Sequence, residues 1–282
     1  MNGSIRINRL TSAEGLILPK VMNGNLRLNS LTSTENLKLP EIMNGILDLD
    51  DLTNAKDLSF PKKVGSLNLS GLTSAEGLVL PEEINGNLYL DSLTNAKGLE
   101  LPKIIGSLYL DSLTSVEGLE LPKIIGSLSL KSLTSAEGLK LPKNINGKLD
   151  LSSLASAEGL ELPKTIGTLN LSSLASARGL VLPEKINGNL NLSSLTSTES
   201  LELPKIIDGY LSLKKLTSAK GLVLPETIDG FLGLSSLISV EELIIPKELN
   251  CELFCPLANN DINILKQMCK SNELDEEIRK TK

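Results

Sequence analysis

One phrase recurs along almost the whole chain. Residues 84–104 read INGNLYLDSLTNAKGLELPKI, and residues 105–124 read IGSLYLDSLTSVEGLELPKI. A fixed period of this length is typical of a solenoid, in which each unit stacks on its neighbours because it cannot bury its apolar side chains alone. The phrase occurs twelve times with a period of 20 or 21 residues, in units that begin at Met1, Met22, Met43, Val64, Ile84, Ile105, Ile125, Ile145, Ile166, Ile186, Ile207 and Ile228.

Each unit contains two short runs of alternating leucines. The first run is G-x-L-x-L, as in residues 65–69, and the second is L-x-L-P, as in residues 78–81. Alternation bounded by glycine and proline predicts two short strands separated by turns. A proline and one or two glycines in every unit would break any helix, so helix is disfavoured here. Two strands in each coil would give a flattened solenoid with two sheets.

Seven columns of the repeat are apolar in almost every unit and predict the core. Aromatic residues make up only 2% of the chain, so leucine and isoleucine must fill this core. The difference between 20 and 21 residues falls at the I-N-G or I-G step, which predicts a surface turn there. In the fifth unit the inward residues are Ile84, Leu88, Leu90, Leu93, Ala96, Leu99 and Leu101.

The phrase L-x-L-x-x-L followed by L-P-x-x-I resembles the leucine-rich repeat. Units of 20–21 residues are most similar to the short bacterial type found in secreted leucine-rich-repeat effectors, and the resemblance covers Met1 to about Glu248. It implies a mainly β fold, a right-handed leucine-rich-repeat-like β-solenoid of about twelve coils. It also implies that the chain acts by binding another protein, with no catalytic residues and no cofactor.

The chain departs from the typical leucine-rich repeat in one column. The column three residues after the second leucine of the first run holds leucine, so the asparagine or cysteine of the typical repeat is absent there. An unbroken Ser/Asn column follows two residues after this leucine. We predict that this column replaces the asparagine ladder, with side chains that bond the turn backbone of the adjacent coil. Its members are Ser12, Ser33, Asn54, Ser74, Asn95, Ser115, Ser135, Ser156, Ser176, Ser197, Ser218 and Ser239.

The two ends of the chain differ. The repeat stops at residue 248, so the expected domains are a solenoid over 1–248 and a small helical C-terminal cap over 249–282. Residues 260–269 have apolar positions at helical spacing, and residues 271–278 resemble a second, charged helix. The N-terminal coil has no equivalent cap. We expect either a fragment of a longer array or a first coil that frays. The second alternative is that the uncapped first coil associates end to end with another chain.

Composition excludes several classes of function. The chain has no histidine, which excludes Ser-His-Asp and Cys-His catalysis and any histidine metal site. A net charge of −6 gives no basic field for nucleic acid or an anionic membrane. The opening residues contain no signal peptide. We therefore expect a cytoplasmic protein from the chain as written, or a secreted or host-delivered one if it is a fragment.

The three cysteines all fall near the C-terminus. Cys251, Cys255 and Cys269 with a carboxylate from Glu252 or Asp261 could form a metal site, but this spacing is not typical of one. The favoured interpretation is that they pack in the cap as small apolar residues, without a metal. A disulfide stays open as an alternative if the protein is exported.

Charged residues occupy the same columns in every coil, so they do not mark one coil as a catalytic site. One column is mostly acidic and another, after proline, is mostly basic. We interpret both as solvated turn residues. The recurring Asn-Gly steps precede strands rather than helices, so they predict turns rather than phosphate-binding loops.

The outward residues of the first strand vary most, while the framework around them hardly changes. Variable contact residues on a constant scaffold are typical of a binding surface. Tyr89 and Tyr109 fall in adjacent coils, and Tyr210 and Phe231 form a second pair shifted by two positions. The candidate binding face contains Arg6, Arg27, Asp48, Asn68, Tyr89, Asp91, Tyr109, Asp111, Tyr210 and Phe231.

The resulting hypothesis is a non-catalytic scaffold that binds a protein partner through the exposed strand face. Two alternatives stay open. A carbohydrate-binding or carbohydrate-active solenoid would need two non-repeating carboxylates a few ångströms apart. A structural rod would assemble end to end.

Overall fold

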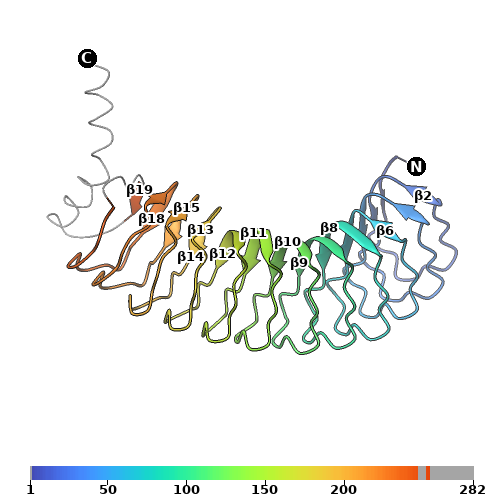
Figure 1. Cartoon of the computed structure of the whole chain (residues 1–282). Helices are drawn as coiled ribbons and strands as arrows, with labels where there is room; N and C mark the ends of the chain where they lie inside the picture. The colour runs from blue at the N-terminus through green and yellow to red at the C-terminus, as the bar shows by residue number, and fades with distance from the viewer. Residues whose placement is uncertain (1, 247–251, 255–282) are drawn as a thin grey trace, which may run out of the picture. The chain divides into compact units, whose positions relative to one another are not determined.

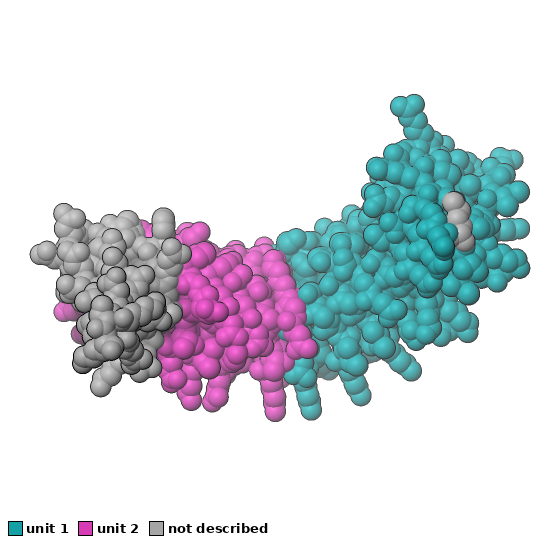
Figure 2. All heavy atoms as spheres, turned by 90° about the horizontal axis from the view of Figure 1, so that it is seen from above, with its two compact units in different colours: residues 1–133, 138–145 teal, residues 134–137, 146–282 magenta. Residues whose placement is uncertain are grey.

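The computed structural model describes residues 2–246 and 252–254. These residues form a mainly β chain, a parallel β-solenoid of about eleven turns, and they contain no helix. The prediction of a mainly β solenoid is therefore confirmed. The chain divides into two compact units, coloured teal and magenta in Figure 2: unit 1 is Met1–Leu133 with Gly138–Ile145, and unit 2 is Thr134–Glu137 with Asn146–Lys282.

Unit 1 is a ladder of parallel strands in which a coil contributes either one strand or two closely spaced short strands (Figure 1). Equivalent leucines pair from coil to coil, as in Leu67↔Leu88 and Leu88↔Leu108. The strands β2 and β4 form a separate two-stranded sheet. The strands are β1 (Ile5–Arg6), β2 (Val21–Met22), β3 (Leu26–Arg27), β4 (Ile42–Met43), β5 (Ile46–Asp48), β6 (Lys63–Val64), β7 (Ser66–Asn68), β8 (Glu83–Tyr89), β9 (Ile104–Tyr109) and β10 (Ile124–Ser129).

Unit 2 repeats the same parallel pairing. Leu190 pairs with Leu211, and Leu211 with Leu232. The strand β11 (Asn144–Asp150) starts at the end of the unit 1 residues and continues into unit 2. The remaining strands are β12 (Thr165–Asn170), β13 (Lys185–Ile186), β14 (Leu190–Asn191), β15 (Ile206–Ile207), β16 (Leu211–Ser212), β17 (Thr227–Ile228), β18 (Phe231–Gly233) and β19 (Glu252–Phe254).

The core lies where the apolar columns predict it. In the fifth coil Ile84, Leu88, Leu90, Leu93 and Ala96 are 0% exposed and Leu99 is 5% exposed. The seventh predicted residue, Leu101, is only half-buried, and the proline that follows it is buried instead. Since full burial of one leucine contributes about 1.5–3 kcal/mol, this ladder is the main source of stability.

The predicted second strand is wrong. None of the L-x-L-P runs forms a strand in the described residues, and the only ladder contact there is an isolated bridge between Val223 and Ile244. Proline has no N–H to donate, so pairing between coils begins only after it, as at β9, which starts two residues beyond Pro102. The second sheet predicted from these runs is therefore absent from the described residues.

The Ser/Asn column stabilises its own coil rather than the adjacent one. Ser74 Oγ accepts a hydrogen bond from the Glu76 N–H at 3.2 Å, and Asn95 Oδ1 accepts one from the Lys97 N–H at 3.2 Å. The same bond, from the N–H two residues later, occurs at all twelve positions of the column, including Ser12, Ser33, Asn54 and Ser115. The predicted bond to the neighbouring coil is thus replaced by a local turn, which side chains of this length reach most easily.

That turn reverses the chain through a left-handed residue. Gly98 has φ +76°, and the Leu99 N–H donates to the Ala96 carbonyl at 3.0 Å. A positive φ at the third turn position favours glycine. Other residues also occupy this position, namely Asn36, Asp57, Ser200 and Glu242, with φ between 59° and 63°.

A different glycine column is required by close stacking. A Cβ added at Gly106 would lie 2.6 Å from the carbonyl oxygens of both Asn85 and Gly86 in the preceding coil. Real Cβ atoms essentially never approach other atoms this closely. The glycine of the first run is therefore needed because the backbones of successive coils touch there.

Both ends add detail to the predicted domains. Beyond residue 246 the described strand β19 pairs with β18 in parallel, with Leu253 opposite Leu232, so strand pairing reaches a segment expected to be only a transition. The predicted helical cap and Cys251, Cys255 and Cys269 lie outside the described residues.

The first coil is less well buried than the coils that follow it. Ile5 and Leu10 are half-buried, whereas their equivalents Leu26 and Leu31 are 0% exposed. End-to-end self-association through this first coil stays a prediction.

Candidate binding face on the parallel strands

The outward side chains of the strands form a polar and aromatic face in each unit. In unit 1 the aromatic part is a pair of tyrosines in neighbouring strands, where Tyr89 of β8 lies opposite Tyr109 of β9. The two rings stack with centroids 4.6 Å apart and planes 14° from parallel. Asn87 Nδ2 donates a hydrogen bond to the Tyr89 hydroxyl at 2.7 Å, which holds the Tyr89 side chain in this orientation. Sequence reasoning missed Asn87, although its place two residues before the tyrosine puts it on the same face.

Two aspartates lie one column away from the tyrosines. Asp91 accepts a hydrogen bond from Ser70 Oγ at 3.1 Å. Asp111 accepts hydrogen bonds from Ser129 Oγ and Lys131 Nζ, both at 2.5 Å. Burial raises the pKa of Asp91, and the negative charge of Asp111 raises it further. Hydrogen bonds from Ser70 and from the Asp111 N–H and the charge of Lys131 lower it, but burial dominates. The two aspartates thus differ: Asp111 forms an ion pair with Lys131, whereas Asp91 feels the charge of Lys131 only from a longer distance.

A polar network continues along the face of unit 1 toward its first coils. Asp48 accepts from Asn68 Nδ2 at 2.8 Å and from Asn29 Nδ2 at 3.2 Å. Arg27 Nε lies 3.9 Å from the Asp48 carboxylate. Arg6 is exposed and donates to Asn8, two residues beyond the end of β1, at 2.9 Å. Much of the predicted face is therefore bonded to itself from coil to coil.

Some outward residues are covered rather than exposed. Asp150 is 2% exposed, Ser129 6% and Ser212 3%. Asp150 bonds Lys148 Nζ at 2.7 Å and Asn170 Nδ2 at 3.1 Å, so its charge is compensated. Short side chains in this column are covered by their neighbours from adjacent coils, which lie only about 4.8 Å away. The sequence suggested that this whole column is exposed, but the structure shows that part of it is buried.

Unit 2 has its own aromatic pair. The rings of Tyr210 and Phe231 stack with centroids 5.0 Å apart and planes 9° from parallel. Phe231 is 43% exposed, which leaves one large apolar ring on the surface of this unit. The pairing that the sequence predicted for these two residues is confirmed.

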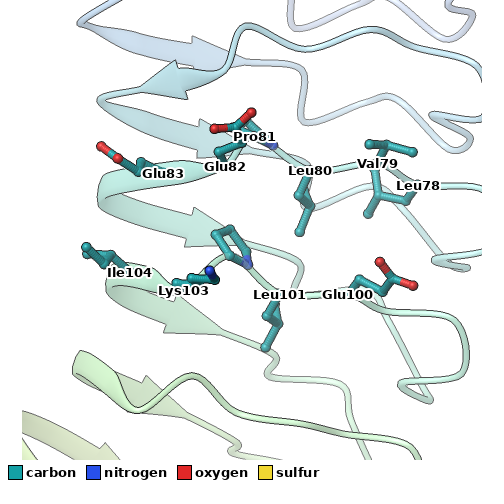
Figure 3. Close-up of a pocket in the computed structure, with 11 residues that line it drawn as sticks. Leu78, Val79, Leu80, Pro81, Glu82, Glu83, Glu100, Leu101, Lys103 and Ile104 are labelled. Atoms are coloured by element: carbon teal, nitrogen blue, oxygen red, sulfur yellow. The ribbon is translucent and has the colours of Figure 1, made fainter.

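Unit 1 also has a shallow hollow between two L-x-L-P runs and the first residues of β8 and β9 (Figure 3). It has a volume of about 540 Å³ and is lined by residues 78–83 and 100–104. Val79 is 73% exposed and Ile104 41% exposed. Glu82 and Glu83 at its rim form ion pairs with Lys62 and Lys63 of the preceding coil. The hollow combines apolar walls with already paired charges and offers no cluster of reactive groups.

Other kinds of site find no support among the described residues. No group of three or more cysteine, aspartate or glutamate side chains there could hold a metal ion. No helix that could serve as a membrane span occurs in the same part of the chain. Comparisons with protein-family models, with curated proteins and with solved structures gave no match.

The unlike environments of the two aspartates give a testable effect on stability. Because the pKa of Asp91 is raised in the folded state, the folded chain binds this proton more tightly than the unfolded chain, and stability falls as the pH rises through that range. Asp91→Asn should therefore raise the thermal midpoint at pH 7 by about 1–2 °C, the scale of one relieved like-charge pair.

The gain should disappear as the pH is lowered below the ordinary pKa of an aspartate, where Asp91 is protonated in both states. Thermal unfolding followed by circular dichroism between pH 3 and pH 7 measures this. Glu100→Gln, at an exposed position of the same coil, is the control and should show no gain. An equal gain for Asp91→Asn at every pH would contradict the electrostatic cause.

Proposed function

We propose that the chain is a leucine-rich-repeat solenoid that works as a non-catalytic scaffold and binds a protein partner through its strand face. The observation that carries the proposal is the contrast between the two sides of each strand. Inward leucines such as Leu88 and Leu108 repeat without change and are 0% exposed. Outward residues at adjacent positions change from asparagine to tyrosine to serine between coils. A constant core with variable outward residues is what a recognition surface requires.

The stacked tyrosines are the proposed anchor of that surface. Tyrosine is enriched where proteins bind one another, because its ring contributes a large apolar area and its hydroxyl forms hydrogen bonds. The Tyr109 hydroxyl has no hydrogen-bond partner among residues 2–246 and 252–254, so it is available to a partner.

Photo-crosslinking tests the proposal. A benzoylphenylalanine placed at Tyr109 should form adducts with a specific protein in the native cell extract. The same photoreactive residue at Val79, which is exposed on the L-x-L-P side, is the matched control. Tyr89→Ala with Tyr109→Ala should abolish pull-down of the crosslinked protein and leave the thermal melt nearly unchanged. Identical adducts from both positions, or pull-down that survives the double change, would refute binding through this face.

A carbohydrate-active role is the second candidate, because Asp91 and Asp111 form a neighbouring carboxylate pair beside two aromatic rings. Retaining glycosidases use carboxyl groups about 5–5.5 Å apart. The Lys131 ammonium on Asp111 weakens this candidate, since that carboxylate is already neutralised. Release of reducing sugar that is lost in both Asp91→Asn and Asp111→Asn would favour it over the scaffold.

A further inference from the structure

We infer that the strand face of unit 1 recognises a basic side chain of its partner, with arginine preferred over lysine. The recognising residues are Tyr89, Tyr109, Asp91 and Asp111, named here the tyrosine–aspartate patch. The inference rests on the proposed function and adds the chemistry of the partner segment. It is carried by the excess of carboxylates over cations on this face and by the position of the rings beside Asp91, a carboxylate that has no ion pair of its own.

The charges on this face do not balance. The outward columns of β5, β8 and β9 and of the residues that follow these strands hold Asp48, Asp50, Asp91 and Asp111. Of the three cations on the same face, Arg6 donates to the neutral Asn8, Arg27 lies against Asp48, and Lys131 lies against Asp111. Asp50 accepts a hydrogen bond only from the neutral Asn29 amide, at 2.9 Å. Within the described residues neither Asp50 nor Asp91 forms an ion pair within 4.0 Å, although the Lys131 ammonium acts on Asp91 from a longer distance and lowers its pKa.

Asp91 is the carboxylate that gains most from an added cation. It is half-buried and faces Asp111 in the next coil, so its charge is both desolvated and repelled. Like charges placed opposite each other on neighbouring strands destabilise the pair. The raised pKa of Asp91 is consistent with this placement. A guanidinium or ammonium group from a partner would offset both the desolvation of the Asp91 carboxylate and its repulsion from Asp111.

The tyrosines place an aromatic surface beside that carboxylate. Tyr89 ends β8 and Asp91 lies two residues beyond it, so their Cα atoms are at most about 7 Å apart. One side of the Tyr89 ring is covered by Tyr109. Its other side faces the coil of Asn68 and Ser70, whose side chains are shorter than a phenol ring. A cation placed there can contact the ring face and reach the Asp91 carboxylate together.

This combination favours arginine. A planar guanidinium stacks on an aromatic ring and still donates to a carboxylate through its edge, whereas an ammonium group is a compact and more strongly hydrated charge. The remaining Tyr109 hydroxyl can bond the backbone of an extended peptide. The partner segment is therefore expected to be a peptide with an arginine next to an apolar or backbone contact.

Selection from a displayed library of random twelve-residue peptides on the full chain tests the inference. Enriched peptides should contain arginine, and the synthetic peptides should bind Asp91→Asn about tenfold more weakly in calorimetric titration. Glu100→Gln is the matched control and should bind as the unchanged chain does. Exchange of the arginine for lysine should weaken binding, exchange for citrulline should weaken it more, and added salt should weaken it in proportion to the charge contact.

The outcomes separate the inference from the proposed function. Peptides that need Tyr89 and Tyr109 but contain no basic residue, or that bind Asp91→Asn unchanged, would overturn the inference and leave the scaffold intact. An oligosaccharide whose binding depends on the tyrosines and ignores Asp91 would overturn it in favour of a sugar. A library with no enriched peptide would also overturn it, and the crosslink at Tyr109 would then decide whether the proposed function survives.

Discussion

Replacing Gly106 by alanine should destabilise the solenoid by about 3 kcal/mol or more, a loss of the size seen when strained backbone or overpacking is forced on a core. The added Cβ would lie 2.6 Å from two carbonyl oxygens of the preceding coil. Backbone oxygens cannot move away as a flexible side chain can, so the two coils must separate. Their separation would break the ladder bonds between β8 and β9 on both sides of the glycine.

Thermal and urea unfolding of the full chain, followed by circular dichroism, measures this loss. Gly98→Asn is the matched control, because a Cβ there meets only ordinary contacts at 3.7 Å and beyond. Asparagine already occupies the equivalent position at residue 36 with φ 62°. The control should therefore cost little. If Gly98→Asn lowered the free energy of unfolding as much as Gly106→Ala does, the close contact between coils would not be the cause of the destabilisation.

Leu108→Ala is expected to cost about 2–5 kcal/mol, the range measured for buried leucines in other proteins. Leu108 is 0% exposed and lies in the ladder between Leu88 and Leu128. Its removal leaves a cavity that neighbouring coils cannot fill, because they are fixed by their own backbone pairing. In a solenoid each coil contacts only its neighbours, so the damage should stay near this coil.

Hydrogen exchange measured by mass spectrometry locates the damage of Leu108→Ala, and chemical unfolding gives its size. Protection should fall mainly in residues 83–129, the strands β8 to β10. Leu101→Ala is the control, because this half-buried leucine carries less of the core. A uniform loss of protection over the whole chain would contradict stabilisation by nearest neighbours.

The inward pattern of the fold could be predicted from the sequence because it depends on periodicity alone. Columns such as Leu88 and Leu90 alternate with polar residues, and a slip by one residue would expose every leucine. The L-x-L-P run shows the same alternation, yet forms no strand, because alternation reports which side chains face inward and not whether the backbone pairs. Pairing there fails at the proline. The strand β19 was missed because its surroundings no longer match the repeated phrase.

The candidate face could be predicted only in part. The tyrosine pair follows directly from the repeat register, because equal positions in successive coils become neighbours. Hydrogen bonds between columns do not follow from it, since the link from Ser70 to Asp91 and the lysine on Asp111 depend on side-chain reach. The burial of Asp150 depends likewise on how neighbouring coils cover it. A sequence gives the column of a residue, and packing decides its exposure.

The step between 20- and 21-residue units is absorbed inside a single strand pair. Between β8 and β9 the register shifts at Ile84 and Asn87, and both Ile84↔Ile105 and Leu88↔Leu108 remain paired. A coil can thus gain or lose one residue without moving the leucines before or after it. The same tolerance applies to whole units, because each coil presents nearly the same two faces to its neighbours. Insertion or deletion of one complete coil should therefore leave the remaining pairing intact and move the aromatic pairs along the array by one turn.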